Sequence, residues 1–275
     1  HMRLIKQENK LYKVYKDNGM PILNIIGKKH VYPNRMKAEV NRLYKIRHLD
    51  GVVKIHSYDG NVIFLDEIDG EDLYTILEKR KRFSEYETRY IAICLLRIVR
   101  NLHVIKIIHG DIKPENIMYN EKTKDVILVD FEYHRHTAKY AAPETIQFKK
   151  YGCKSDVWGI GATIYTMLMG HNPYNDNNHL FSGISYHEID KNISVEARDF
   201  INNTLVIDYH MRPTIQQCFQ YSWITKMGVA SIQHEIPTYK RRLTTPSPEP
   251  CAYIKPLEIE CSILEEEKPC CCLVC

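Results

Sequence analysis

The sequence predicts an α+β protein in which a small strand-rich part precedes a larger helical part. Strand-forming segments fill residues 5–65 around a single helical pattern, and from residue 71 onward apolar residues recur at helical spacing. The 275 residues are 44% hydrophobic and 26% charged, which is an ordinary globular composition and a length sufficient for a large core.

The N-terminal elements follow from local patterns. A strand is expected at 10–16, and Asp17-Asn18-Gly19 is a turn typical of a hairpin that returns as a strand at 22–26. Asn34 is expected to cap the next helix, whose apolar residues have helical spacing. Two more strands are expected, at 52–56 and 61–65.

The C-terminal elements begin with a long helix. Ser84 and Glu87 form a capping-box pattern ahead of a helix that reaches about residue 105. Two short apolar segments, at 117–118 and 126–129, are expected as strands. Three more helices are expected, near 155–170, 194–206 and 214–220.

Charge and hydropathy exclude several classes of protein. The 38 basic and 34 acidic residues give a net charge of +4, too balanced to favour nucleic acid as the main partner. No apolar run approaches the roughly 18 residues of a membrane span, and the N-terminus lacks a secretory-signal pattern. We expect a cytoplasmic monomer.

One string of residues carries the chemistry. His109-Gly110-Asp111-Ile112-Lys113-Pro114-Glu115-Asn116 is followed, fourteen residues after Asn116, by Asp130. Phosphoryl transfer needs an acidic group that orients the attacking hydroxyl and oxygen ligands that hold a divalent metal. We expect Asp111 to orient the hydroxyl and accept its proton, Lys113 to neutralise the transferred phosphoryl, and Asn116 and Asp130 to bind the metal.

These residues resemble the eukaryotic protein kinase family, as do Ala142-Pro143-Glu144, the stretch from Asp156 to Gly161, and Arg212. The resemblance covers roughly residues 8–225, and the C-terminal half is closest to the calcium/calmodulin-dependent kinases. It implies a bilobal kinase-like fold that uses ATP with Mg²⁺ or Mn²⁺. The expected parts are an N-lobe and hinge at 3–68, a C-lobe at 69–228 and a flexible Pro/Cys-rich tail at 229–275.

The resemblance also assigns roles to residues of the C-terminal half. It implies a buried ion pair between Glu144 and Arg212, and hydrogen bonds from the catalytic-loop backbone to Asp156. Lys113 two residues after Asp111, and Thr137 five residues before Ala142, follow the Ser/Thr kinase pattern, in which the threonine contacts the catalytic aspartate. The implied substrate is a protein with Ser or Thr hydroxyls.

The nucleotide-binding half departs from the family. Glu39 fits the helix glutamate that pairs with a strand lysine, but Asn24 stands at the lysine position, 15 residues earlier. Lys28 and Lys29 follow the expected strand, and we expect neither to substitute. Ile22 stands where the family keeps a small alanine over adenine, and extra volume there would narrow the pocket.

The glycine-rich loop is also missing. Aligned back from Val14, its glycines fall on Gln7, Asn9 and Tyr12, so the backbone approaches phosphates less closely. With-no-lysine kinases supply the lysine from the first hairpin, which leaves Lys10, Lys13 and Lys16 as alternatives. By resemblance the remaining adenine contacts are the gatekeeper Leu65, the hinge Asp66 to Ile68, and Met118 as the pocket floor.

Two departures lie between the lobes. Asp130-Phe131-Glu132 replaces Asp-Phe-Gly, and Glu132 either restricts switching of the loop or adds a metal ligand. Only four residues separate Glu132 from Thr137, and Gly110 replaces the arginine that reads a phosphorylated activation loop. We therefore expect no switching by activation-loop phosphorylation.

Three functions stay open at this point. The four polar residues Asp111, Lys113, Asn116 and Asp130 favour a Ser/Thr protein kinase, whereas Asn24 favours a pseudokinase that acts as a binding module. A small-molecule phosphotransferase also carries His-Gly-Asp, but lacks the Ala-Pro-Glu string.

Cysteines dominate the end of the chain. Cys272 starts a C-a-a-X pattern for prenylation, and Cys270 and Cys271 would then be palmitoylation sites. Two lipid chains give stable anchoring, so the tail is a candidate membrane tether. The same string could instead bind metal or carry reactive thiols.

Overall fold

The computed structural model of the protein describes residues 2–8, 11–16, 21–132, 139–174 and 189–226, with side chains from residue 25 onward. The chain divides into two units, His1–Arg242 and Leu243–Cys275, and every described residue lies in the first. Within these ranges, no helix has the length and apolarity needed to cross a bilayer.

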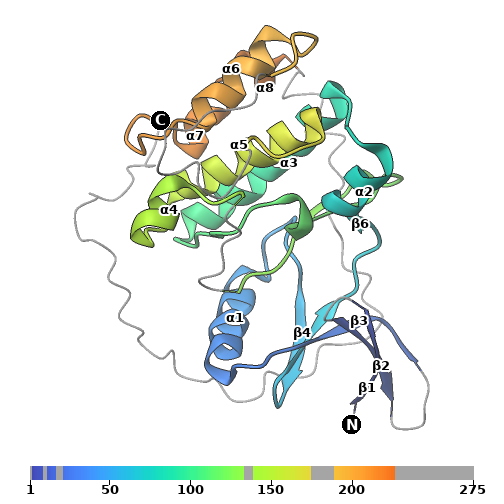
Figure 1. The fold of residues 1–275 in the computed structure, drawn as a ribbon. Helices are drawn as coiled ribbons and strands as arrows, with labels where there is room; N and C mark the ends of the chain where they lie inside the picture. Colours follow the sequence, from blue (N-terminus) through green and yellow to red (C-terminus); the bar gives the residue numbers. More distant parts are fainter. Residues whose placement is uncertain (1, 9–10, 17–20, 133–138, 175–188, 227–275) are drawn as a thin grey trace. The chain divides into compact units, whose positions relative to one another are not determined.

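A five-stranded antiparallel sheet forms the N-terminal part, in the order β1-β2-β3-β5-β4 (Figure 1). The expected turn at 17–19 lies outside the described residues, but the strands on either side of it pair antiparallel, as a hairpin requires. Strand β1 was not predicted. The strands are β1 (Met2–Glu8), β2 (Leu11–Lys16), β3 (Pro21–Lys29), β4 (Ile55–Asp59) and β5 (Val62–Asp66).

Strand β3 is longer than its apolar residues predict. It continues to Lys29 because the stretch from Ile25 to Lys29 pairs with β5, from Asp66 back to Val62. Lys28 is therefore a residue of the central sheet rather than of the connection that follows it.

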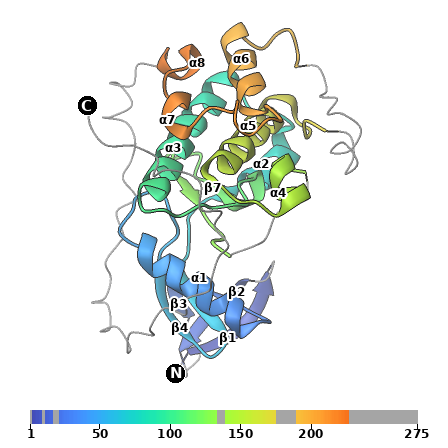
Figure 2. The same cartoon turned by 90° about the vertical axis from the view of Figure 1, so that its left-hand side faces the viewer.

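Helix α1 (Pro33–Ile46) is the only described helix beside this sheet (Figures 1 and 2). The prediction that Asn34 caps it is wrong, because the helix begins at Pro33, which has no N–H to satisfy at the first helical position. The side of α1 that faces the protein is apolar except for Glu39, which is buried with Met36, Val40 and Leu43.

The second part of the fold is helical. Helix α3 begins after Ser84, whose side chain accepts the N–H of Glu87, as the capping pattern predicts. Figure 2 shows α3 and α5 side by side. The helices are α2 (Leu73–Arg80), α3 (Glu85–Val104), α4 (Pro143–Phe148), α5 (Cys153–Met169), α6 (Val195–Thr204), α7 (Ile215–Cys218) and α8 (Ser222–Thr225).

A small second sheet positions the catalytic string, residues 109–116, between the strand-rich part and the helical part, and its middle strand begins directly after the string. It has the order β6 (Glu71–Asp72), β7 (Ile117–Tyr119) and β8 (Val126–Leu128). Leu128 exchanges backbone hydrogen bonds with Gly51 and Val53, which follow α1. This connection brings the end of β8, and therefore Asp130, close to the N-terminal sheet.

Candidate active site

The ammonium of Lys28 lies between two carboxylates that come from different parts of the fold. Its Nζ is 2.7 and 3.0 Å from the two oxygens of Glu39 on α1, and 2.6 Å from Oδ1 of Asp130. Asp130 has a φ of 63°, in the left-handed region that aspartate tolerates better than most residues. Sheet, helix and the loop after β8 thus converge on one cation.

Electrostatics keep this lysine charged. Burial disfavours the ammonium, but the charges of Glu39 and Asp130 and their hydrogen bonds outweigh it, so the pKa of Lys28 is raised above its ordinary value. A lysine that stays charged in a nearly buried position is suited to steady phosphate groups.

The expectation that Asn24 holds the lysine position is wrong, and so is the expectation that Lys28 does not substitute. The contact with Glu39 belongs to Lys28, which stands 11 residues before Glu39. The residue two positions before the lysine is therefore Ile26, not Ile22, and Ile26 lies opposite Leu65 in the sheet. No local pattern distinguishes Lys28 from the other residues of this strand, and its contact with Glu39 is what assigns it.

The catalytic string forms a compact loop around Asp111, which is buried. Lys113 Nζ donates to Asp111 Oδ2 at 2.8 Å. Asn116 Nδ2 donates to the backbone oxygen of Asp111 at 2.8 Å and to its Oδ2 at 3.2 Å. The three residues predicted from sequence spacing are thus brought together, and Asn116 holds the loop closed.

Asp156, at the start of α5, fixes the backbone of this loop, as the resemblance implies. Its two carboxylate oxygens accept the N–H groups of His109 at 3.0 Å and Gly110 at 2.8 Å. His109 Nε2 lies 3.0 Å from the backbone oxygen of Val129, which ties the loop to the segment carrying Asp130. The φ of Gly110 is +81°, which favours glycine.

A second histidine, His103, lies 2.8 Å from Asp156 through its Nε2. Burial lowers the pKa of His103, but hydrogen bonds to Asp156 and Cys153 outweigh burial and raise it from 6.5 to about 10. The imidazolium is thus favoured in the folded chain more than in the unfolded one. Its contribution to stability is complete below pH 6.5 and is lost as pH rises toward 10.

We therefore predict that a His103→Gln chain loses less stability than the wild type when pH rises from neutral to about 10. Urea unfolding at several pH values measures the difference between the two free energies of unfolding. The exposed His48→Gln chain is the control and should follow the wild type. A difference between wild type and His103→Gln that does not change with pH would contradict the assignment.

Glu144 and Arg212 form the buried ion pair that the resemblance implies. Arg212 Nη1 and Nη2 donate to the two oxygens of Glu144 at 2.8 and 3.0 Å. The Arg212 side chain is fully buried and lies over the ring of Trp158, 4.9 Å from its centroid. The pair joins α4 to the segment before α7.

The residues expected around adenine lie at the junction of the two parts. Leu65 and Asp66 end β5 and are buried, while Ile68 and Met118 are half-buried. The side chains of Val14, Ile22 and Asn24 are outside the described ones, although their strands are described. Thr137 and the tail cysteines Cys270, Cys271 and Cys272 also lie outside the described residues.

Comparison with known proteins agrees with this geometry. Residues 22–224 match the model of the protein kinase domain family. Death-associated protein kinase dapk-1 of Caenorhabditis elegans is 30% identical over 72% of this chain and 16% of its own length. Calcium/calmodulin-dependent protein kinase type 1B of Rattus norvegicus is 31% identical over 73% of the chain and 65% of its own length.

The type 1 kinase of Caenorhabditis briggsae is 28% identical over 73% of this chain and 63% of its length. The match thus spans less than two thirds of each of the first relatives. The family match covers most of the chain and includes the lysine, the catalytic loop and the Glu144–Arg212 pair described above. The chain therefore belongs to the protein kinase family, with relatives among the calcium/calmodulin-dependent Ser/Thr kinases.

Proposed function

We propose that the chain is an active Ser/Thr protein kinase that transfers the γ-phosphate of ATP to protein hydroxyls. The observation that carries the proposal is the contact of Lys28 with both Glu39 and Asp130. Asn24, Ile22 and the absent glycines favour a pseudokinase, whereas the contacts of Lys28 support an active kinase. The arrangement also leaves a charged ammonium where phosphates need one.

The side chains fit a divalent metal and a hydroxyl substrate. Asn116 uses its Nδ2 in the loop, so its amide oxygen is suited to a hard cation, together with the carboxylate of Asp130. A bound Mg²⁺ or Mn²⁺ would neutralise the phosphate charge. Asp111 orients the attacking hydroxyl and takes its proton, while Lys113 stabilises the charge on the transferred group.

Control by activation-loop phosphorylation is not part of this proposal. Tyr151 supports that view, since a Cβ at Gly110 would lie 3.2 Å from its ring. Gly110 stands where the family carries an arginine that binds a phosphorylated residue. Its backbone is in the left-handed region and it packs closely against Tyr151, so a larger residue would be strained there. We propose a kinase that keeps one competent state.

The decisive experiment measures phosphoryl transfer from Mg-ATP or Mn-ATP to a mixed protein substrate, with the Asp111→Asn chain as background. We expect transfer to Ser and Thr in the wild type only. In parallel, a thermal shift with metal and ATP should be lost in Asp130→Asn. Equal transfer by wild type and Asp111→Asn would refute the kinase.

A pseudokinase is the second candidate, and Ile26 is the observation that favours it. Ile26 is half-buried, packs against the core and lies opposite Leu65, where the family keeps a small residue. The side chain would narrow the adenine pocket. No thermal shift with millimolar ATP would support this candidate over the kinase.

The proposal places the kinase in the cytoplasm, tethered to a membrane through Cys270, Cys271 and Cys272. The C-a-a-X pattern and the two preceding cysteines support it. Intact mass of protein from eukaryotic cells should show added lipid that is lost in Cys272→Ser. An unmodified mass in both proteins would refute the tether.

A further inference from the structure

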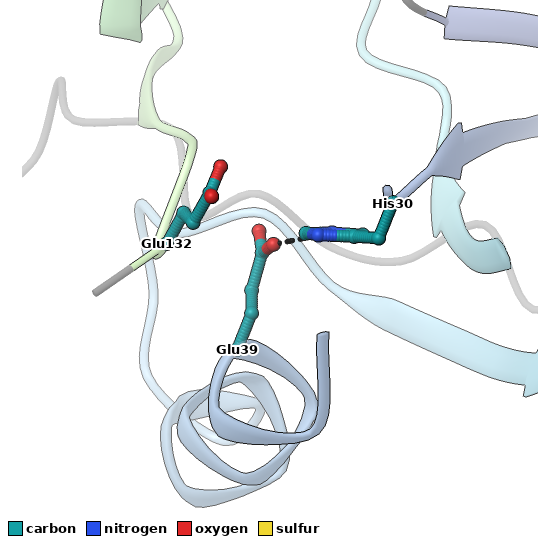
Figure 3. A group of neighbouring side chains, drawn as sticks. All are labelled: His30, Glu39 and Glu132. Carbon is teal, nitrogen blue, oxygen red and sulfur yellow. Dashed lines mark ion pairs between the residues drawn. The ribbon is translucent and has the colours of Figure 1, made fainter. Parts of the chain in front are cut away.

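Three side chains that can bind metal lie together beside the contacts of Lys28 with Glu39 and Asp130, and each comes from a different segment. His30 follows β3, Glu39 comes from α1, and Glu132 lies two residues after Asp130 (Figure 3). One ligand atom of each lies within 4.8 Å of the other two, and all three residues are buried. The kinase mechanism uses Glu39 through Lys28, but gives no role to His30 or Glu132.

His30 is held in place by its backbone, and its Nε2 contacts Glu39 without an aligned hydrogen bond. Its N–H donates to the Asn61 backbone oxygen at 2.8 Å, and Asn61 Nδ2 donates to the His30 oxygen at 3.1 Å. His30 is 5% exposed, and among the described residues no aligned hydrogen bond satisfies its Nε2, although Glu39 Oε2 lies 2.8 Å away. A buried nitrogen of this kind is costly without a partner, and a bound ion would supply one.

The two carboxylate oxygens of Glu39 have different neighbours: both contact Lys28, and only Oε2 also contacts His30. Oε1 is the nearer oxygen to Lys28, at 2.7 Å, while Oε2 is 3.0 Å from Lys28 and 2.8 Å from His30. A cation bound at Oε2 therefore need not displace the lysine from Oε1. The kinase ion pair and a metal ion can share this carboxylate.

Three carboxylates lie close together in this region. The carboxylates of Glu39 and Asp130 contact the ammonium of Lys28, and a Glu132 oxygen lies within 4.8 Å of the Glu39 carboxylate. Arg35 is a second cation of this region, and its half-exposed guanidinium is 3.8 Å from Glu132. Buried carboxylates need compensating charge, and a divalent cation would provide it.

We propose that His30, Glu39 and Glu132 bind one Zn²⁺ ion. An imidazole nitrogen with two carboxylates suits zinc better than magnesium or calcium, which prefer oxygen ligands alone. Ligands about 2.0 Å from a tetrahedral ion are about 3.3 Å apart, so His30 and Glu39, which are 2.8 Å apart, would separate slightly. Three protein ligands leave a fourth position for water.

The ion would fasten α1 to the segment that carries Asp130. Glu39 and Glu132 belong to these two elements, which must both be in place for Lys28 to bridge Glu39 and Asp130. The site would hold the arrangement that other kinases secure by phosphorylating the activation loop. Glu132, which replaces the family's glycine, would then have a structural purpose.

The test uses the full chain with the six cysteines of the tail changed to serine, since thiolates bind zinc strongly. Zn²⁺ is titrated against a chromogenic chelator in excess Mg²⁺, which occupies oxygen-only sites. We expect one bound Zn²⁺ per chain and a Zn²⁺-dependent rise in melting temperature. Co²⁺ as a probe should give a spectrum of nitrogen and oxygen ligands without thiolate charge transfer.

Two variants and a control decide the assignment. His30→Ala and Glu132→Gly should each weaken Zn²⁺ binding at least about tenfold, whereas His48→Ala, an exposed histidine on the same background, should bind normally. Glu132→Gly restores the family's residue, so it remains informative if His30→Ala fails to fold. Unchanged affinity in Glu132→Gly, or no zinc bound by the background chain, would overturn the site.

Discussion

Lys28→Met is expected to lower kcat/KM for phosphoryl transfer from Mg-ATP by about 10²- to 10³-fold, the range for losing one preorganised charge in an active site. Lys28 contacts both Glu39 and Asp130, so its replacement removes the positive charge between two carboxylates where phosphates should bind. Initial rates at varied ATP concentration measure the effect, and thermal unfolding confirms that the variant is folded at the assay temperature.

Lys29→Met is the matched control, because Lys29 is the next residue of β3 and its side chain is exposed. Its kcat/KM should stay close to that of the wild type. An equal loss in both variants would mean that the effect arises from the strand and not from the Lys28 contacts.

A double variant tests the alternative lysine position. Adding Asn24→Lys to Lys28→Met should not restore activity, because the two positions are four steps, or about 13 Å, apart along the strand. Restored activity would contradict the assignment of the nucleotide lysine to Lys28.

Arg212→Leu is expected to reduce the free energy of unfolding by about 3–5 kcal/mol, the usual cost of removing one partner of a buried ion pair. Arg212 also donates to two backbone oxygens in addition to Glu144. Its Nε donates to the Val206 oxygen at 3.1 Å, and its Nη1 donates to the Lys154 oxygen at 2.8 Å. Among the described residues, the Glu144 carboxylate would keep its hydrogen bond from the Ser155 hydroxyl, at 2.9 Å. Urea unfolding gives the midpoint and the slope.

Two controls separate the buried charge from the loss of side-chain volume. Arg47→Leu, on an exposed arginine, should change stability by about 0.5 kcal/mol or less. The double variant Glu144→Leu/Arg212→Leu should be less destabilised than the sum of the two single changes, because neither charge is left alone. Additive losses would indicate that packing, and not the ion pair, sets the cost.

The order of the elements could be predicted because the patterns that define them are local. The helix after Ser84 begins where its capping residue predicts, and α5 and α6 lie close to the expected ranges. Strand β1, helices α2, α4 and α8, and strand β6 were not predicted as separate elements. Helices α4 and α8 and strand β6 have six residues or fewer, whereas α2 is capped by Asp72, a signal that could have found it.

The position of the lysine could not be settled by pattern. Asn24, Ile26 and Lys28 are spaced two residues apart along one strand, so all three belong to the same face of the sheet. The alternation of strand residues therefore does not distinguish between them. The pairing of β3 with β5 and the placement of α1 against them select Lys28.

The sequence by itself determined the catalytic loop, because Asp111, Lys113 and Asn116 lie within six residues and their hydrogen bonds close a local turn. Only the tertiary structure decided which lysine joins Glu39 and Asp130, since Lys28 is separated from them by 11 and 102 residues. It also decided that His30 and Glu132 meet at Glu39. Contacts between distant residues depend on how sheet, helix and loop pack together, and no local pattern records that packing.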